Sequence, residues 1–231
     1  MDYRRRKAIQ KFLQVSVIAI VLLFFLFPII WTFITSIKDN VTAWSMPPKI
    51  FFSPSVSNYV EIFKERGLHH NIKNSIIVAL GATAISLVLG TPLAYMFART
   101  RYRLNNFLFI FVFASYILPP IVLSIPLYVA AARVGLLNTY LVVILAHSSF
   151  CMAFTVWMLR GFFEEIPVEI EECAMVDGCS NLMTLFRVTL PIARPGLVAT
   201  VIFCIILSWN DFMYALVLTG MDTRTLPVAV G

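Results

Sequence analysis

The chain has 231 residues, of which 60% are hydrophobic and only 13% are charged, and its formal net charge is +6. Soluble domains are about 45–50% apolar and about 25% charged. The composition therefore excludes a soluble enzyme and a disordered chain, and it predicts a membrane-embedded protein. The basic residues stand in short runs beside apolar stretches, which is typical of membrane flanks and gives no reason to expect a nucleic-acid partner.

Five segments are long and apolar enough to cross a membrane, which requires about 20 residues. They cover approximately residues 12–37, 72–97, 107–131, 140–159 and 196–219. The first segment follows four basic residues, but it is too long to be the apolar region of a signal peptide. We therefore expect an all-α integral membrane protein, a polytopic helix bundle whose transmembrane domain is formed by residues 12–219.

Lysine and arginine predict the orientation, because cytoplasmic flanks carry an excess of both. With residues 1–11 inside, the inside segments hold 11 of these residues and the outside segments hold 7. The N-terminus is therefore predicted to be cytoplasmic. Residues 38–71 then form an external cap, in which prolines break helices and one short amphipathic helix is expected near residues 56–63. Residues 161–195 form a cytoplasmic hairpin, and residues 220–231 form an external loop.

Several kinds of chemistry are absent from the sequence. None of the six lysines is followed by serine or threonine, so the chain has no Walker A motif for ATP. The motifs HExxH and GxSxG are also missing. The four cysteines lack the spacing of a metal site or a disulfide framework. We expect no metal, no cofactor and no catalysis by this chain, so that uphill transport driven by ATP needs an ATPase on another chain.

The hairpin at residues 161–195 carries signals for two short helices. Pro167 suits the first position of a helix, and Gly178 suits a left-handed C-cap. Ser180 is a candidate N-cap for the second helix, which Pro191 is expected to end. Half of the 12 acidic residues lie in this stretch: Glu164, Glu165, Glu169, Glu171, Glu172 and Asp177.

One side of the first predicted helix combines small and acidic residues. Ile170, Cys173, Ala174 and Asp177 share this side, and the small residues allow another surface to approach closely. Such a hairpin suits docking into a groove of a partner protein. A solvated loop that caps the bundle is the alternative, since charge runs usually mark solvated faces.

The hairpin resembles the EAA loop of ABC importer permeases. The family pattern is E-A-A-x3-G-x9-I-x-L-P, and this chain has Glu172-Cys-Ala174, then Gly178, then Val188-Thr-Leu-Pro191 at the same spacing. Cys173 and Val188 depart from the pattern by small or isosteric changes. Shorter motifs resemble carbohydrate permeases of the MalG type in the same order along the chain: Ser36-Ile-Lys38, Asn58-Tyr59, Asn74-Ser75, Ala94-Tyr95-Met-Phe-Ala-Arg99, Leu118-Pro119, Ile125-Pro126-Leu-Tyr128, Leu137-Asn-Thr-Tyr140, Trp209-Asn-Asp-Phe212 and Thr225-Leu-Pro227.

The resemblance implies a type I permease fold and half of a solute pathway for a sugar or oligosaccharide, operated by alternating access. It implies a prokaryotic inner membrane and, as partners, a second permease subunit, two ABC ATPase subunits and an extracytoplasmic solute-binding protein. The family continues into a sixth span, so this chain is expected to be one span short. The implied ATPase-coupling residues are Glu169, Glu172, Cys173, Ala174, Asp177, Gly178, Leu190 and Pro191.

Other functions stay open at this point. They are a permease for glycerol phosphate or a polyol, an ATP-independent carrier or channel, and an inactive or regulatory membrane protein derived from a permease. The hairpin favours the ABC importer over the ATP-independent carrier.

Polar and proline residues inside the predicted spans are candidates for the translocation pathway. Asn210 and Asp211 lie in the fifth segment, where an ionisable group is costly and marks a candidate functional site. An interhelical hydrogen bond or an interfacial position is the alternative. His147 in the fourth segment poses the same choice. Pro119 kinks the third segment, either to make an irregular cavity wall or only for packing.

Overall fold

The computed structural model describes residues 3–64, 67–100 and 103–231, and the regular structure within these ranges is entirely helical. The chain divides into two units, Met1–Gly67 and Leu68–Gly231. Arg66 and Arg101, which contributed to the charge count, lie outside the described residues, and so do the side chains of Arg4, Arg5, Arg6 and Arg103.

The first unit contains α1 (Tyr3–Ser36), α2 (Asn40–Ala43) and α3 (Ser57–Lys64). The apolar part of α1, Gln10–Ser36, has none of its most apolar window buried inside the chain. A helix that is hydrophobic all round and exposed to this degree is suited to lipid or to a partner helix. The helix α3 confirms the short helix predicted in the cap.

Lys38 lies just after the end of α1, and its buried ammonium group has partners within the first unit. Its side chain is buried, its Nζ donates a hydrogen bond to the carbonyl of Lys49 at 2.9 Å, and it lies 5.3 and 5.0 Å from the ring centroids of Trp31 and Phe52. Two aromatic faces and a carbonyl thus replace the water that a buried ammonium group loses.

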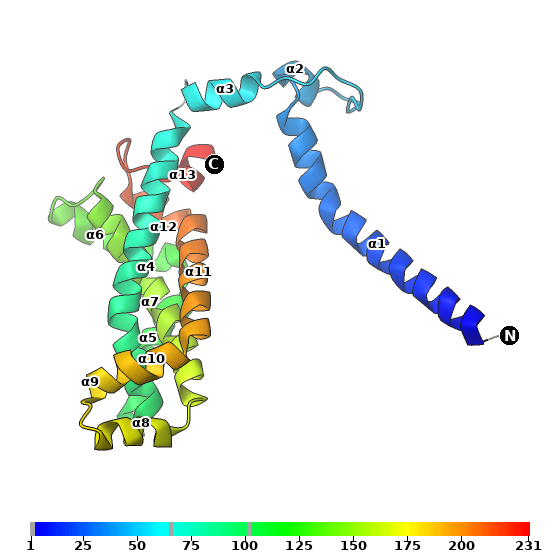
Figure 1. Ribbon diagram of the computed structural model, residues 1–231. Helices are drawn as coiled ribbons and strands as arrows, with labels where there is room; N and C mark the ends of the chain where they lie inside the picture. Colours follow the sequence, from blue (N-terminus) through cyan, green and yellow to red (C-terminus); the bar gives the residue numbers. More distant parts are fainter. Residues whose placement is uncertain (1–2, 65–66, 101–102) are drawn as a thin grey trace. The chain divides into compact units, whose positions relative to one another are not determined.

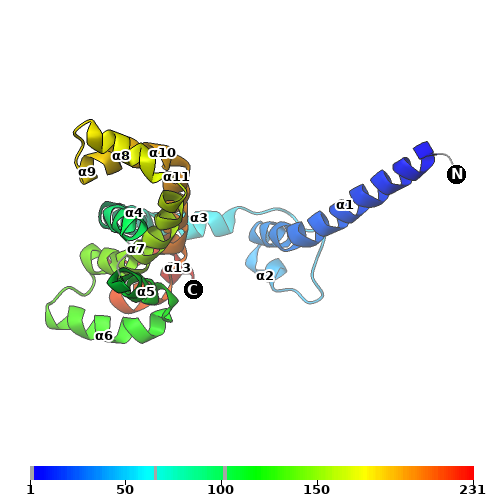
Figure 2. The same cartoon turned by 90° about the horizontal axis from the view of Figure 1, so that it is seen from below.

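The second unit is built around α4 (Leu68–Arg99) and α7 (Tyr140–Glu164), which pack side by side (Figures 1 and 2). Two glycines permit the close approach. A Cβ atom on Gly81 would lie 2.8 Å from Ile144, and one on Gly90 would lie 2.9 Å from Thr155. Small residues at helix interfaces are typical of membrane bundles, where dispersion and not the hydrophobic effect holds helices together.

The third predicted span is broken. It consists of α5 (Arg103–Ile117) and α6 (Pro120–Arg133), whose axes differ by 92°. Pro119 has extended backbone (φ −56°, ψ 131°) and Pro120 begins α6, so the break falls where two prolines remove the helical amide donors. The prediction of one kinked helix over residues 107–131 was therefore wrong, whereas Pro126 lies inside α6 without ending it.

The fifth predicted span is also interrupted. The helix α11 (Arg194–Asn210) ends because Asp211 has extended backbone (φ −66°, ψ 130°), and the short helix α12 (Met213–Leu218) follows. After the loop of residues 219–225, α13 (Leu226–Val230) ends the chain. A continuous helix over residues 196–219 was expected, since hydropathy does not register a break whose flanks are both apolar.

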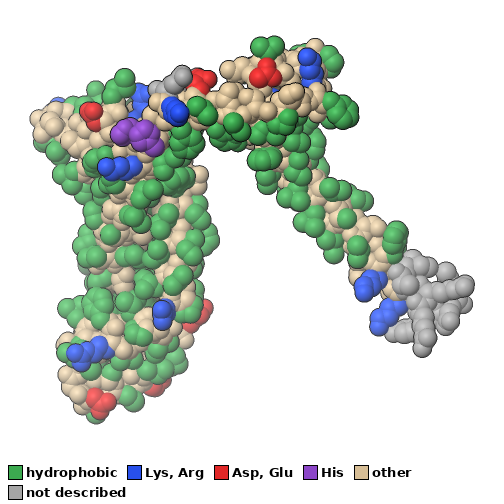
Figure 3. All heavy atoms as spheres, turned by 45° about the horizontal axis from the view of Figure 1, so that its top comes forward, with side chains coloured by type: hydrophobic (Ala, Val, Ile, Leu, Met, Phe, Trp, Pro, Cys, Tyr) green, Lys and Arg blue, Asp and Glu red, His purple; other side chains and the backbone are tan. Residues whose placement is uncertain are grey.

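By length and composition, three described helices can cross a membrane, or up to five if each bent helix pair is one span. In the second unit, apolar side chains cover the middle, and charged side chains gather near the ends (Figure 3). The helices α8 to α10 lie at one end of α4, and α13 lies near the other (Figure 1). These are called below the hairpin end and the far end.

Candidate functional site: an acidic hairpin fixed to the helix bundle

The first arm of the hairpin is α8 (Val168–Val176). Pro167 is its N-cap, with extended backbone, and not its first helical residue as predicted. Gly178 has φ +91°, which confirms the predicted left-handed cap. The N–H of Gly178 donates to the carbonyl of Met175, and the N–H of Cys179 donates to that of Ala174, both at 3.0 Å. These two bonds form a Schellman motif, which satisfies the last carbonyls of α8.

The second arm runs through α9 (Asn181–Thr184), the π-helical turn η1 (Leu185–Thr189) and α10 (Leu190–Ile192). The Ser180 hydroxyl accepts a hydrogen bond from the Met183 amide at 3.3 Å, which confirms the predicted N-cap. Pro191 does not end this arm as expected. It lies inside α10, and the chain turns by 85° at Ala193, where α11 begins.

The predicted coupling residues are on the outside of the hairpin. Ala174 and Leu190 are half-buried, and the others are exposed: Glu169, Glu172, Cys173, Asp177, Gly178 and Pro191. Apolar side chains are exposed on the same helix, since Ile170 and Val176 are 42% and 88% accessible. The hairpin therefore offers a mixed acidic and apolar surface at one end of the bundle, which suits a protein partner better than water.

Glu171 is the buried residue of α8, and no motif in the sequence distinguishes it from the acidic residues around it. Its side chain is only 1% exposed. The carboxylate accepts four hydrogen bonds: from Tyr95 at 2.8 Å, from Arg99 Nε at 2.9 Å and Nη2 at 2.7 Å, and from Thr189 at 2.8 Å. Tyr95 and Arg99 lie one turn apart at the end of α4. We call these four side chains the hairpin clamp.

The hairpin clamp joins three elements at one carboxylate. Arg99 binds Glu171 through two nitrogens, the geometry that gives strong and oriented ion pairs. Its Nη2 also donates to the carbonyl of Ile166 in the α7–α8 connection. Burial raises the pKa of Glu171, but the hydrogen bonds it accepts, led by those from Arg99, outweigh burial and hold the pKa below its ordinary value of 4.5. The carboxylate is therefore ionised at neutral pH.

The hydrophobic core at this end supports the clamp. It unites residues of α4, α7 and the hairpin: Ala94, Tyr95, Phe97, Val156, Leu159, Phe163, Ile166, Leu185 and Ala193. The only sequence signal that could have pointed to the clamp is the spacing of Tyr95 and Arg99, which lie at i and i+4 on one helix face. The choice of Glu171 as their partner, over five other acidic residues of the stretch, depends on tertiary packing.

Three of the four candidate pathway residues lie at two helix breaks, and the fourth, His147, lies inside α7. A cavity of about 340 Å³ is lined by Ser115, Tyr116, Leu118, Pro120, Phe150, Ile206, Leu207, Asn210, Asp211 and Tyr214. It contains two of the predicted residues, Asn210 and Asp211. His147 and Pro119 are not among its lining residues. Pro119 is at the α5–α6 break, directly before the lining residue Pro120.

His147 is a packed, hydrogen-bonded histidine. It is fully buried, its Nδ1 lies 2.7 Å from the hydroxyl of Ser208, and its Nε2 lies 3.1 Å from Asp211 Oδ2. The same Asp211 oxygen accepts a hydrogen bond from the Ala215 amide at the start of α12. Asp211 is thus fixed by the first turn of the helix that follows it, while the His147 ring of α7 lies beside it at ion-pair distance without a hydrogen bond from Nε2.

Three short motifs meet at the far end. Asn74 donates to the carbonyls of Asp222 and Arg224 at 3.0 and 2.9 Å and accepts from the Tyr140 hydroxyl at 2.7 Å. The Ser75 hydroxyl accepts from the Leu226 amide at 2.8 Å. The motifs around residues 74, 140 and 226, which looked unrelated in the sequence, therefore tie the loop of residues 219–225 to α4 and α7.

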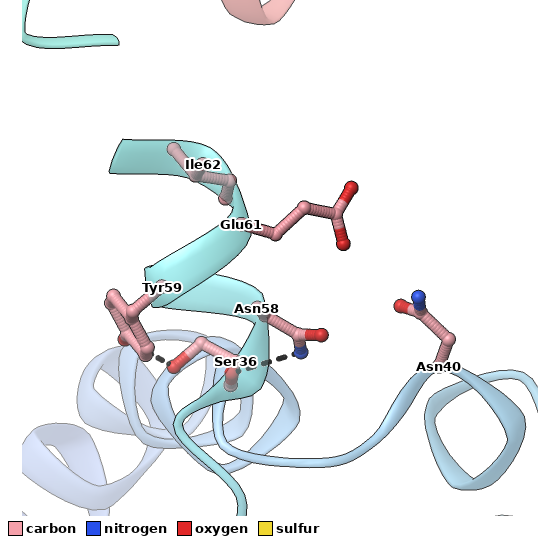
Figure 4. Close-up of a pocket in the computed structure, with 6 residues that line it drawn as sticks. All are labelled: Ser36, Asn40, Asn58, Tyr59, Glu61 and Ile62. Atoms are coloured by element: carbon pink, nitrogen blue, oxygen red, sulfur yellow. Dashed lines mark hydrogen bonds between the residues drawn. The ribbon is translucent and has the colours of Figure 1, made fainter. Parts of the chain in front are cut away.

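A polar hollow of about 320 Å³ lies in the first unit, lined by Ser36, Asn40, Asn58, Tyr59, Glu61 and Ile62 (Figure 4). The Ser36 hydroxyl is hydrogen-bonded to the Tyr59 hydroxyl at 2.7 Å, and Asn58 donates to the carbonyls of Ser36 and Lys38. These bonds hold α3 against the end of α1.

Among the described residues, no group of three or more His, Cys, Asp or Glu side chains is arranged to hold a metal ion.

The chain is similar to known transport proteins. Residues 86–229 match the family described as "Binding-protein-dependent transport system inner membrane component". The sulfoquinovosyl glycerol transport system permease SmoH of Agrobacterium fabrum is 32% identical over 89% of this chain and 73% of the relative. The trehalose/maltose permease MalG of Thermococcus litoralis is 28% identical over 98% of this chain and 82% of the relative. A bacterial ABC transporter that imports the acidic polysaccharide alginate has the same fold, with a TM-score of 0.77 and 22% identity over all of this chain and 81% of that one.

Proposed function

Because this chain belongs to the family of binding-protein-dependent transport system inner membrane components, we propose that it is the permease subunit of an ABC importer for a sugar or oligosaccharide. It forms half of the solute pathway and leaves ATP hydrolysis to a separate ATPase. Relatives named for trehalose/maltose and for sulfoquinovosyl glycerol support a carbohydrate solute.

The observation that carries the proposal is the two-sided construction of α8. Its outer side exposes Glu169, Glu172 and Cys173, while its inner side buries the ionised Glu171 in the bundle. A carboxylate can be buried only where hydrogen bonds satisfy its lone pairs, and the four bonds to Glu171 do so and hold α8 in one orientation on the bundle. Burial of Glu171 fixes the acidic face of the hairpin outward, where an ATPase subunit binds it.

The mechanism is alternating access. ATP binding closes the ATPase dimer, which draws the two hairpins of the permease pair together and turns the spans outward to receive solute from the solute-binding protein. Hydrolysis reverses the motion. The hairpin and the N-terminus face the cytoplasm, and the loop of residues 219–225 faces the outside.

The cavity at Asn210 and Asp211 forms part of the solute pathway. Transporters place binding sites where helices are discontinuous, because the freed backbone groups there must face protein or water. Two breaks, α5–α6 and α11–α12, border this one cavity. Asn210 and Asp211 provide hydrogen-bonding groups, and Tyr116 and Phe150 provide rings for sugar faces. His147 and Pro119 do not line the cavity. His147 positions Asp211, and Pro119 keeps the α5–α6 break open.

The native cysteines allow a direct test. The tagged protein is purified from its own membrane and treated with a bifunctional maleimide crosslinker. Cys173 is exposed and Cys179 half-buried, whereas Cys151 and Cys204 are buried in the bundle. We expect crosslinks to an ATP-binding protein that disappear in Cys173→Ser but persist in Cys151→Ser. If no ATPase copurifies, or if crosslinking is independent of Cys173, the chain is not coupled through this hairpin.

A further inference from the structure

The hairpin has two covalent connections to the bundle, and both are points where it can pivot. Pro167 interrupts the helix between α7 and α8, and the 85° turn at Ala193 separates α10 from α11. A push on α8 would rotate the hairpin about these points unless something else held it. The hairpin clamp is that restraint, since Arg99 of α4 binds Glu171 of α8 and Glu171 also binds Thr189 of the second arm.

The helix that carries the clamp runs the full length of the unit. A helix of 32 residues is about 48 Å long, more than the thickness of a hydrocarbon core. It is packed closely against α7 through Gly81 and Gly90. A pair of helices in such close contact moves as one body more readily than it bends.

At the far end, α4 holds the loop of residues 219–225. Asn74 donates to two carbonyls of this loop, and both of its amide hydrogens are used. Asn138 adds bonds from its own position beside α7: its Oδ1 accepts from the Gly220 amide and the Thr223 hydroxyl, both at 2.9 Å. The pair of α4 and α7 is therefore hydrogen-bonded to the hairpin at one end and to the far loop at the other.

We propose that Arg99 and Glu171 are positioning residues that make the hairpin move as one body with α4 and α7, so that its displacement reaches the far loop through Asn74. This inference rests on the proposed function, because it specifies how movement of the coupling hairpin leaves it. Without the clamp, the hairpin still docks and moves, but it pivots at Pro167 and Ala193 and the far loop stays behind.

The test compares spin labels at the two ends of the transporter, purified with its ATPase in lipid nanodiscs. One background keeps Cys179, which is half-buried and outside the predicted coupling set, and carries Cys173→Ala, the residue of the family pattern at this position. The other carries Cys173→Ala, Cys179→Ser and Met221→Cys, since Met221 is 83% exposed in the far loop. Cys151 and Cys204 are fully buried and do not label. Spectra are recorded without nucleotide and with ATP plus vanadate, which arrests the ATPase cycle.

In the otherwise unchanged protein, both labels are expected to respond to vanadate trapping. In Arg99→Gln/Glu171→Gln the label at position 179 should still respond, and the response at position 221 should be lost. The double substitution removes both charges, so no unpaired charge is left buried to unfold the protein. Asn74→Ala removes the two hydrogen bonds from α4 to the far loop without touching the hairpin, and it is expected to weaken the response at position 221 while the response of the hairpin stays.

The matched control is Arg160→Gln/Glu164→Gln. This pair is also an arginine–glutamate ion pair at the same end of the bundle, with Arg160 Nε 2.7 Å from the Glu164 carboxylate. Both residues lie on α7, and Arg160 also lies 4.3 Å from the ring centroid of Phe109 on α5, so the pair is separate from the hairpin clamp. Both labels should respond in this variant as in the parent. A preserved response at position 221 in the clamp variant and in Asn74→Ala would overturn the inference. If position 179 of the parent itself does not respond, the proposed coupling function is wrong instead.

Discussion

Single residues decide how firmly the hairpin is held, and Glu171 is the most informative of them. A carboxylate with four hydrogen-bond donors has little capacity left. Its removal leaves Arg99 charged and mostly buried, with the carbonyl of Ile166 and the ring face of Tyr95 as its uncharged partners. Loss of one member of a buried ion pair is costly for this reason.

Glu171→Gln is therefore expected to lower the free energy of unfolding by about 3–5 kcal/mol. Unfolding of the purified protein by sodium dodecyl sulfate, followed by far-ultraviolet circular dichroism, measures the loss. Glu164→Gln is the matched control, because Glu164 is an exposed partner in an i,i+4 pair and should change stability by no more than about 0.5 kcal/mol. Equal losses in the two variants would show that burial of the clamp contributes nothing.

The depressed pKa of Glu171 also predicts a dependence on pH. A carboxyl group whose pKa is lower in the folded state stabilises the fold above its unfolded pKa, here 4.5, and loses this contribution as pH falls through the folded value. The stability difference between the parent protein and Glu171→Gln should therefore stay constant from pH 8 to 5 and shrink below about pH 4.5. A difference that shrinks between pH 8 and 6 would contradict the assignment.

Among elements, the sequence predicted most where local signals act alone. Gly178 and Ser180 were identified as caps because their roles depend on neighbours a few residues away. From the sequence, the break at Pro119 was predicted only as a kink. At Asp211 only the cost of an ionisable group was noted, and no break was predicted. Whether a helix bends slightly or turns by 92° depends on what packs into the gap, which no local pattern contains.

Gly178 provides a prediction at this scale. Nothing lies within 4 Å of a Cβ atom placed on it, so Gly178→Ala tests backbone strain without a steric clash. Its φ of +91° costs an L-residue about 1–2 kcal/mol, and unfolding in detergent should show a loss of this size.

Gly161→Ala in α7 is the matched control, since its Cβ would also meet open space but its backbone is helical. There alanine should stabilise the protein by about 0.5–1 kcal/mol. Opposite signs for the two substitutions are the expected result, and a stabilising Gly178→Ala would argue against the left-handed turn.

For the whole molecule, composition was enough to predict a membrane protein, the EAA-like loop was enough to predict the family, and the order of the shorter motifs favoured its carbohydrate subgroup. The convergence of Asn74, Tyr140 and Leu226 at the far end was beyond the sequence, because residues 150 positions apart meet only after the bundle folds. The hairpin clamp could not be predicted from the sequence either, because its residues also meet only after folding. The residues that face outward were the easier ones to find, since their motif is contiguous.

The membrane orientation makes a prediction about the whole chain. A membrane-impermeant maleimide should label Cys173 only in inside-out vesicles, and it should label Met221→Cys in the Cys173→Ser, Cys179→Ser background only in right-side-out vesicles. Both positions are exposed, so access depends on the side and not on burial. Labelling of both positions from one side would refute the predicted topology.

The early end of α11 has a consequence for the lipid around the protein. Its 17 residues extend about 25 Å, less than the roughly 30 Å of a typical hydrocarbon core, so the crossing is completed only beyond Asp211, by α12. A thicker bilayer places the break and its carboxylate deeper in hydrocarbon, at a dielectric cost that grows with membrane thickness. Transport should therefore be fastest in bilayers of short acyl chains and slow as the chains lengthen, which makes membrane thickness a control on this protein.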